Sequence, residues 1–100
     1  MKIEKTVNET AVYLYVLEGE DKDDLHSVIN FAALERNVII LDFSKTTSIN
    51  SAFIAGLVKV YEECVEKNIK FIIHDMNELV QNVFGCVGIT TVLKNAITAD

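Results

Sequence analysis

Four side chains in this sequence could take part in chemistry if the fold brings them together: Asp42, Ser51, His74 and Asp75. A serine hydroxyl beside an imidazole can act as a nucleophile with its base, and a carboxylate can orient the imidazole. However, no GxSxG turn surrounds Ser51, the chain has no P-loop, and its two histidines do not stand at a metal-ligand spacing. We therefore expect no enzyme, no cofactor and no metal. A small hydrolase or ligand-binding protein that uses Ser51, His74 and Asp75 is the alternative from another functional class.

Asn50 and Ser51 directly precede a segment whose apolar residues recur at helical spacing. The simplest interpretation is that one of the two is an N-cap, since its side-chain oxygen can accept from the free N–H groups of the first turn. A hydroxyl at this position also faces the positive end of the helix dipole. For Asp75, which follows a predicted strand, a capping role before the next helix is likewise favoured over chemistry.

A strand and a helix must position this pair of residues. The unbroken apolar run from Val38 to Leu41 predicts a strand buried on both faces, and Asp42 closes it. Ser44 to Asn50 then predicts a polar loop, and a long helix is expected from Ser51 to about Lys67. The loop therefore lies at the carboxyl end of a central strand, where open α/β sheets usually carry their function.

The remaining pattern predicts a single α/β domain. Asn8-Glu9-Thr10 is expected to be a hairpin turn, and the strand, helix and strand from residue 37 to residue 74 should form a unit with parallel strands. The sheet should be mixed, with four to five strands and helices packed on it. Further strands are predicted at 2–7, 11–17, 70–74 and 91–93, and further helices from Asp21 or Asp23 to Leu34 and over 77–87.

The segment Ile49-Asn50-Ser51-Ala52-Phe53-Ile54, after a strand and a short polar loop, resembles the signature of STAS domains, the family of bacterial anti-sigma-factor antagonists. That signature typically has the form Asp-Ser-Ser/Thr/Ala-Gly-Leu. The similarity in order and spacing extends over nearly the whole chain, including Gly19-Glu20 and the segment Phe84 to Ile89. Two residues depart from it: Asn50 stands where the family usually has Asp, and Phe53 where it usually has Gly.

This resemblance implies a role for several residues. Ser51 matches the phosphorylatable serine or threonine of the family, and Asp42 matches an acidic position close to the modified loop. The implied partner is an anti-sigma factor or a related serine kinase, which would supply the ATP and Mg²⁺. The residues expected to contact it are Asp42, Ser48, Asn50, Ser51, Ala52 and Phe53.

The helix that begins at Ser51 has an apolar arc wider than packing on a sheet requires. One face carries Ile54, Leu57, Val58, Tyr61 and Val65, and a second stripe beside it carries Phe53, Val60 and Cys64. Val60 and Cys64 are expected to extend the core. Phe53, in the first turn beside Ser51, is instead expected to be exposed and to contact the partner.

Length and composition limit the possible function. With 100 residues, the chain has room for one domain, 1–100. A net charge of −6, with an acidic cluster at Glu18 to Asp24, disfavours nucleic acid and anionic membranes as partners. The chain has no membrane-spanning apolar stretch and no signal-peptide pattern, so a cytoplasmic location is expected, with Cys64 and Cys86 reduced.

We therefore predict a bacterial signalling protein that regulates transcription by binding an anti-sigma factor, with phosphorylation of Ser51 as the switch. Phosphate would add about −1.5 to −2 charge at this position and force release of the partner. An alternative keeps the fold but discards the switch. The chain would then be a constitutive scaffold subunit of a larger signalling or transport complex.

Overall fold

The computed structural model describes residues 2–20, 22–87, 93, 96 and 97. These form a single α/β domain with a mixed sheet of five strands and three helices, which confirms the predicted fold class. The predicted strand at 91–93 lies outside the described residues, except for Leu93, which is buried. In chain order the elements are β1 (Lys2–Val7), β2 (Val12–Gly19), α1 (Lys22–Ala33), β3 (Val38–Asp42), β4 (Ser48–Ile49), α2 (Ser51–Glu66), β5 (Lys70–His74) and α3 (Glu78–Val87).

The main sheet has the strand order β1-β2-β3-β5. β1 and β2 form an antiparallel hairpin, and Asn8 confirms the predicted turn because its Oδ1 accepts hydrogen bonds from the N–H groups of Thr10 and Ala11, both at 2.8 Å. β3 lies between β2 and β5 and is parallel to both, so the predicted parallel unit is confirmed. The carboxyl ends of β2, β3 and β5 consequently share one edge of the sheet.

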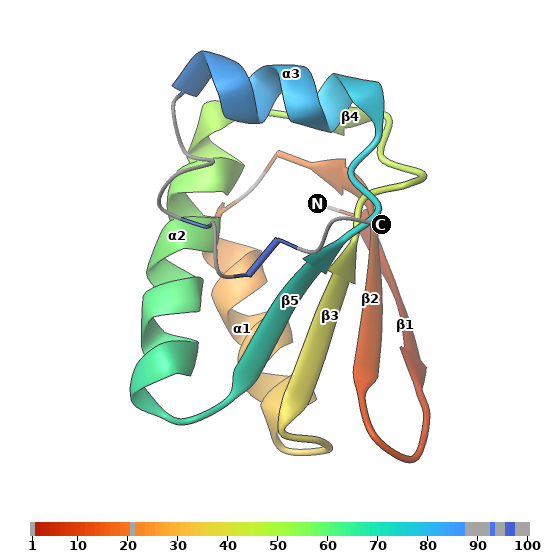
Figure 1. Ribbon diagram of the computed structural model, residues 1–100, viewed down its shortest axis with the longest axis vertical. Helices are drawn as coiled ribbons and strands as arrows, with labels where there is room; N and C mark the ends of the chain where they lie inside the picture. Colours follow the sequence, from red (N-terminus) through yellow and green to blue (C-terminus); the bar gives the residue numbers. More distant parts are fainter. Residues whose placement is uncertain (1, 21, 88–92, 94–95, 98–100) are drawn as a thin grey trace.

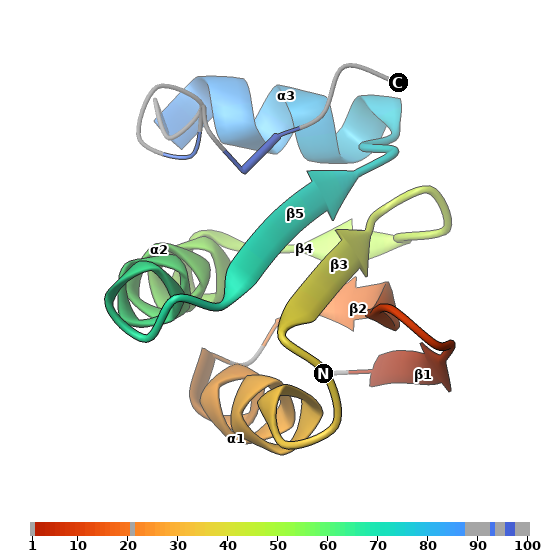
Figure 2. The same cartoon turned by 60° about the horizontal axis from the view of Figure 1, so that its bottom comes forward.

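Two helices cover one face of the sheet, and the third lies across its end. Figures 1 and 2 show α1 and α2 side by side on the same face, while α3 lies beyond the arrowheads of β3 and β5. The core between the sheet and the helices contains Leu25, Ile29 and Ala32 of α1, all of them buried. It also contains Val60 and Cys64 of α2, which confirms that these two residues extend the core.

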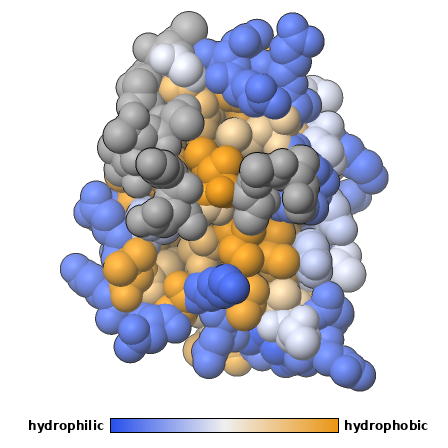
Figure 3. Space-filling model, in the orientation of Figure 1, coloured by the Kyte–Doolittle hydropathy of each residue, from blue (hydrophilic) through white to orange (hydrophobic). Residues whose placement is uncertain are grey.

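The prediction that β3 is buried on both faces is wrong. Ile39 and Leu41 point toward the helices and are fully buried, but Val38 and Ile40 are only half-buried. The helices cover one face, so alternate residues of β3 face the less protected side. Figure 3 shows apolar side chains gathered on the surface over β3 and β5.

Two features of the segments before the helices differ from the expectations. The polar stretch before α2 contains β4, whose two residues pair with Glu18 and Gly19 of β2 in parallel, a strand too short for a sequence pattern to reveal. The end of α2 agrees with the prediction of about Lys67, since the helix ends at Glu66 and Asn68 then adopts a left-handed backbone with a φ of 59°. Asn77 caps α3, because its Oδ1 accepts from Val80 N at 3.0 Å, so the prediction of a cap at Asp75 is wrong.

Candidate functional site

Asn50 and Ser51 occupy the start of α2, as predicted, and their roles differ. Asn50 is the N-cap: its Oδ1 accepts a hydrogen bond from Phe53 N at 3.0 Å, and its Nδ2 donates to Glu20 O at 3.1 Å. Ser51 is the first helical residue and is exposed, as is Ala52. The first turn carries no acidic side chain. The structure therefore presents a small hydroxyl group at the positive end of a 16-residue helix.

The loop before α2 is held to the sheet along its length. The Thr46 hydroxyl donates to Val16 O, and Thr47 N donates to Leu17 O at 2.8 Å. Asn77 Nδ2 donates to Thr46 O at 2.8 Å, which ties this loop to the segment before α3. Because β2 and the segment before α3 both contribute hydrogen bonds, the loop that leads to Ser51 is held in place.

Phe53 is fully buried, so the prediction that it is exposed and contacts a partner is wrong. A Cβ atom built on Gly19 would lie 3.0–3.2 Å from three carbons of the Phe53 ring, so the ring packs directly on the glycine backbone. Phe53 also meets Phe43 edge to face, with the ring centroids 6.4 Å apart, and Phe43 in turn meets Phe84 of α3 at 6.1 Å. These aromatic rings anchor the start of α2 to the core.

The other hydroxyl groups near Ser51 are engaged or less accessible. Ser44 Oγ donates to Asp42 Oδ1 at 2.6 Å, and Ser48 Oγ donates to Glu20 Oε1 at 3.0 Å. Thr46 is buried, with 4% of its surface exposed. Thr47 is exposed, and its hydroxyl donates to Leu17 O at 3.2 Å. All four of these residues precede α2, whereas the Ser51 hydroxyl lies in its first turn.

Asp42, His74 and Asp75 converge at the carboxyl ends of β3 and β5. Asp42 and His74 are partners in the parallel register, and His74 Nδ1 lies 3.9 Å from Asp42 Oδ2 and 3.3 Å from Asp75 Oδ2. Asp42 is 7% exposed, and its Oδ1 accepts from Ser44 N at 2.8 Å, so it shapes the start of the loop. The described neighbours of Nδ1 are therefore carboxylates, an arrangement that can hold a cation.

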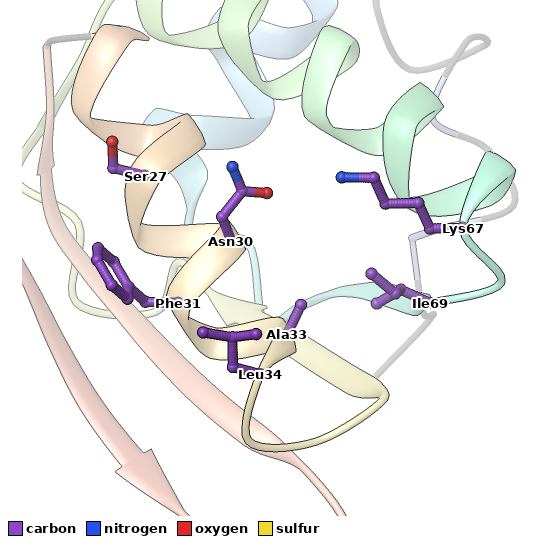
Figure 4. A pocket seen from close by; sticks show the side chains of 7 residues that line it. All are labelled: Ser27, Asn30, Phe31, Ala33, Leu34, Lys67 and Ile69. Carbon is purple, nitrogen blue, oxygen red and sulfur yellow. The ribbon is translucent and has the colours of Figure 1, made fainter.

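An apolar groove lies elsewhere, between the ends of α1 and α2 (Figure 4). Phe31 of α1 and Leu34, which directly follows this helix, border the groove and are 69% and 83% exposed. Lys67 and Ile69, just beyond the end of α2, form the opposite wall. Since α2 is about 24 Å long at 1.5 Å per residue, the groove is well separated from Ser51.

Comparison with known proteins assigns the fold to a family. The family model for the STAS domain matches residues 3–97. The chain belongs to the STAS domain family. No curated protein matches the sequence significantly. Among the described residues, no helix is long and apolar enough to cross a membrane.

Solved STAS-like structures share this architecture at low sequence identity. The anti-sigma factor antagonist SpoIIAA in its unphosphorylated form is 16% identical, with a TM-score of 0.74, and covers 97% of this chain and 86% of its own. SpoIIAA of Bacillus in its phosphorylated form is 14% identical, with a TM-score of 0.68 and coverages of 97% and 89%. A candidate anti-sigma factor antagonist from Thermotoga maritima is 18% identical, with a TM-score of 0.75 and coverages of 98% and 86%. The chain thus has an anti-sigma-factor-antagonist-like fold.

Three residues that support the site were not singled out for this role from the sequence. Glu20 contacts both Ser48 and Asn50, Gly19 accommodates the Phe53 ring, and Asn77 holds the loop. The STAS resemblance did point to Gly19-Glu20. For Asn77, the only available signal was its place before an apolar helical pattern, which predicts a cap.

Proposed function

We propose that this chain is a cytoplasmic bacterial regulatory module that binds an anti-sigma factor with serine kinase activity, and that phosphorylation of Ser51 ends the binding. The proposal rests on membership of the STAS family and on the likeness to SpoIIAA, which has been solved in unphosphorylated and phosphorylated forms. The observation that carries it is the position of Ser51, which is the exposed first residue of α2 and follows a loop that is hydrogen-bonded to β2.

The partner would contact the exposed start of α2 and the loop beside it. Ser51, Ala52 and Ala55 are small and exposed, so a partner surface can approach the helix closely. Ser48 is half-buried and Asn50 is exposed at the edge of the same surface. Asp42 acts through its hydrogen bonds to Ser44 rather than by direct exposure. Phe53 supports this surface from beneath.

Phosphate on Ser51 should be tolerated by the domain itself. The free N–H groups and the dipole of α2 favour an anion at this end, and the first turn carries no acidic side chain that would repel it. The penalty therefore falls on the complex, where a bulky dianion must be desolvated between closely packed surfaces. Modification would release the partner without unfolding the protein.

Asn50 changes this site relative to the usual STAS signature. Its amide caps α2, so the structural part of the role of Asp is retained. A carboxylate that could orient the Ser51 hydroxyl is missing. We expect Asn50→Asp to raise the rate of phosphorylation while leaving the helix cap intact.

Incubation with ATP, Mg²⁺ and an anti-sigma-factor kinase from the same organism, followed by mass spectrometry of the peptides, tests the proposed site. We expect one phosphate, on Ser51, and none on the Ser51→Ala variant. Ser27→Ala, at an exposed serine of α1 away from this surface, is the matched control and should be phosphorylated like the parent. Phosphate on Ser44, Thr46, Thr47 or Ser48 would overturn the site, and none anywhere would support the constitutive scaffold instead.

A further inference from the structure

We propose that Asp42, His74 and Asp75 form a binding site for a divalent transition-metal ion such as Zn²⁺. The three ligand atoms, one imidazole nitrogen and two carboxylate oxygens, lie within 4.8 Å of one another. They occupy the carboxyl edge of parallel strands, where open α/β sheets commonly bind ligands. This site is independent of the proposed phosphorylation of Ser51.

The separations suit a single small ion. Zn²⁺ binds histidine nitrogen and carboxylate oxygen at about 2.0–2.2 Å, so two ligands at tetrahedral angles stand about 3.3–3.5 Å apart. Here the distance from His74 Nδ1 to Asp75 Oδ2 is 3.3 Å, and the distance from His74 Nδ1 to Asp42 Oδ2 is 3.9 Å. The three ligand atoms lie within 4.8 Å of one another, so Asp42 would move closer to His74, and the two carboxylates closer together, when an ion binds.

The three ligands differ in how firmly the surrounding protein holds them. Asp42 is buried, and its other oxygen, Oδ1, accepts two hydrogen bonds from Ser44, an arrangement that orients a ligating carboxylate. The side chains of His74 and Asp75 are 28% and 42% exposed, whereas Nδ1 of His74 is itself buried, so an ion would reach it past the Asp75 carboxylate. Two carboxylates close to one imidazole also supply the charge that a dication neutralises.

The choice of ligands indicates the class of metal. Mg²⁺ and Ca²⁺ prefer sites built from oxygen alone, whereas an imidazole together with carboxylates suits Zn²⁺ and other divalent transition metals. A bound ion would connect the ends of β3 and β5, next to the loop that leads to Ser51. It would therefore stabilise the strand ends and the loop that position Ser51.

Binding of Zn²⁺, and of Co²⁺ as its coloured substitute, tests this site. The full chain, without a polyhistidine tag and with Cys86→Ser to remove a competing thiol, is stripped with a chelator and titrated by calorimetry and visible absorption. We expect one ion per chain, tighter binding of Zn²⁺ than of Mg²⁺, and a melting temperature that rises with Zn²⁺. His74→Ala and Asp75→Asn should each weaken binding by about tenfold or more and abolish the rise.

His26 provides the matched control, because it is the other histidine of the chain and, among the side chains that the structure describes, pairs with one carboxylate, Glu63, at 2.7 Å. His26→Ala should leave the Zn²⁺ affinity within about twofold of the parent. Circular dichroism of each variant establishes that it is folded. Equal losses in His26→Ala and His74→Ala, no loss in either ligand variant, or the absence of saturable binding by the parent would overturn the proposal.

Discussion

Phe53 and Gly19 offer the sharpest test of how the start of α2 is supported. Phe53 is fully buried against Gly19 and Phe43, so Phe53→Ala should destabilise the domain by about 3–5 kcal/mol through lost burial and a residual cavity. For a chain of 100 residues, 1 kcal/mol corresponds to about 4–8 °C, so the melting temperature should fall by at least about 12 °C. The exposed Phe31 is the control, and Phe31→Ala should change stability by no more than about 0.5 kcal/mol.

The effect of Gly19→Ala on the free energy of unfolding should depend on the Phe53 ring, and a double-mutant cycle of the two residues should show this. Gly19→Ala alone places a methyl group 3.0 Å from the buried ring, which should cost about 1–3 kcal/mol. When Phe53 is already Ala, the obstruction is absent and alanine is preferred to glycine by about 0.5–1 kcal/mol within a strand. Gly19→Ala should therefore be destabilising in the parent and neutral or stabilising in the Phe53→Ala variant.

Urea denaturation followed by circular dichroism measures both free energies of unfolding. Gly85→Ala in α3 is the control, because a Cβ atom there meets nothing within 4 Å, and it should stabilise both backgrounds about equally. A Gly19→Ala cost that is the same with and without the Phe53 ring would refute the packing argument. So would a Phe53→Ala variant that melts within a degree or two of the parent.

Three further predictions follow from burial and capping. Ile39→Asp should lower the free energy of unfolding by several kcal/mol because Ile39 is fully buried, and Ile40→Asp should lower it clearly less because Ile40 is half-buried. Urea denaturation that ranks the two variants the other way would contradict the assigned faces of β3. Asn50→Ala should cost about 1 kcal/mol, whereas Asn50→Asp should be nearly neutral in the same assay. Burial raises the pKa of the Cys64 thiol, so at pH 8 less of it is thiolate than of a free cysteine. In a Cys86→Ser variant, a disulfide reagent should label Cys64 slowly until urea is added, and rapid labelling of the native protein would show an open site.

The fold could be predicted from the sequence because its signals are local. Alternating or continuous apolar runs marked β1, β2, β3 and β5, and helical spacing marked the three helices. The two-residue β4 could not be predicted, since its formation depends on pairing with the end of β2 rather than on its own composition. The error at Ile40 has a similar origin, because an apolar run does not reveal whether one or both faces of its sheet are covered.

The site could be predicted only in part. The start of α2, with Ser51 at its first residue, followed from the change of pattern at Asn50 together with the STAS resemblance. The burial of Phe53 did not, because it depends on Gly19, a residue 34 positions earlier in the chain that leaves room for the ring. Asp42, His74 and Asp75 could be singled out because they follow predicted parallel strands, but their proximity depends on the register of β3 and β5, which the sequence does not reveal.

The most direct test of the proposed function is the affinity of the purified kinase for the unmodified protein and for the protein phosphorylated on Ser51, measured by calorimetry. We predict that phosphorylation weakens binding by about tenfold or more, which corresponds to about 1.4 kcal/mol, while the melting temperature stays unchanged. Ser51→Asp should weaken binding in the same direction, and Ser27→Asp, which adds the same charge at an exposed position on α1, should not. Equal affinities for the two forms, or a loss of binding that follows loss of the fold, would contradict a switch at Ser51.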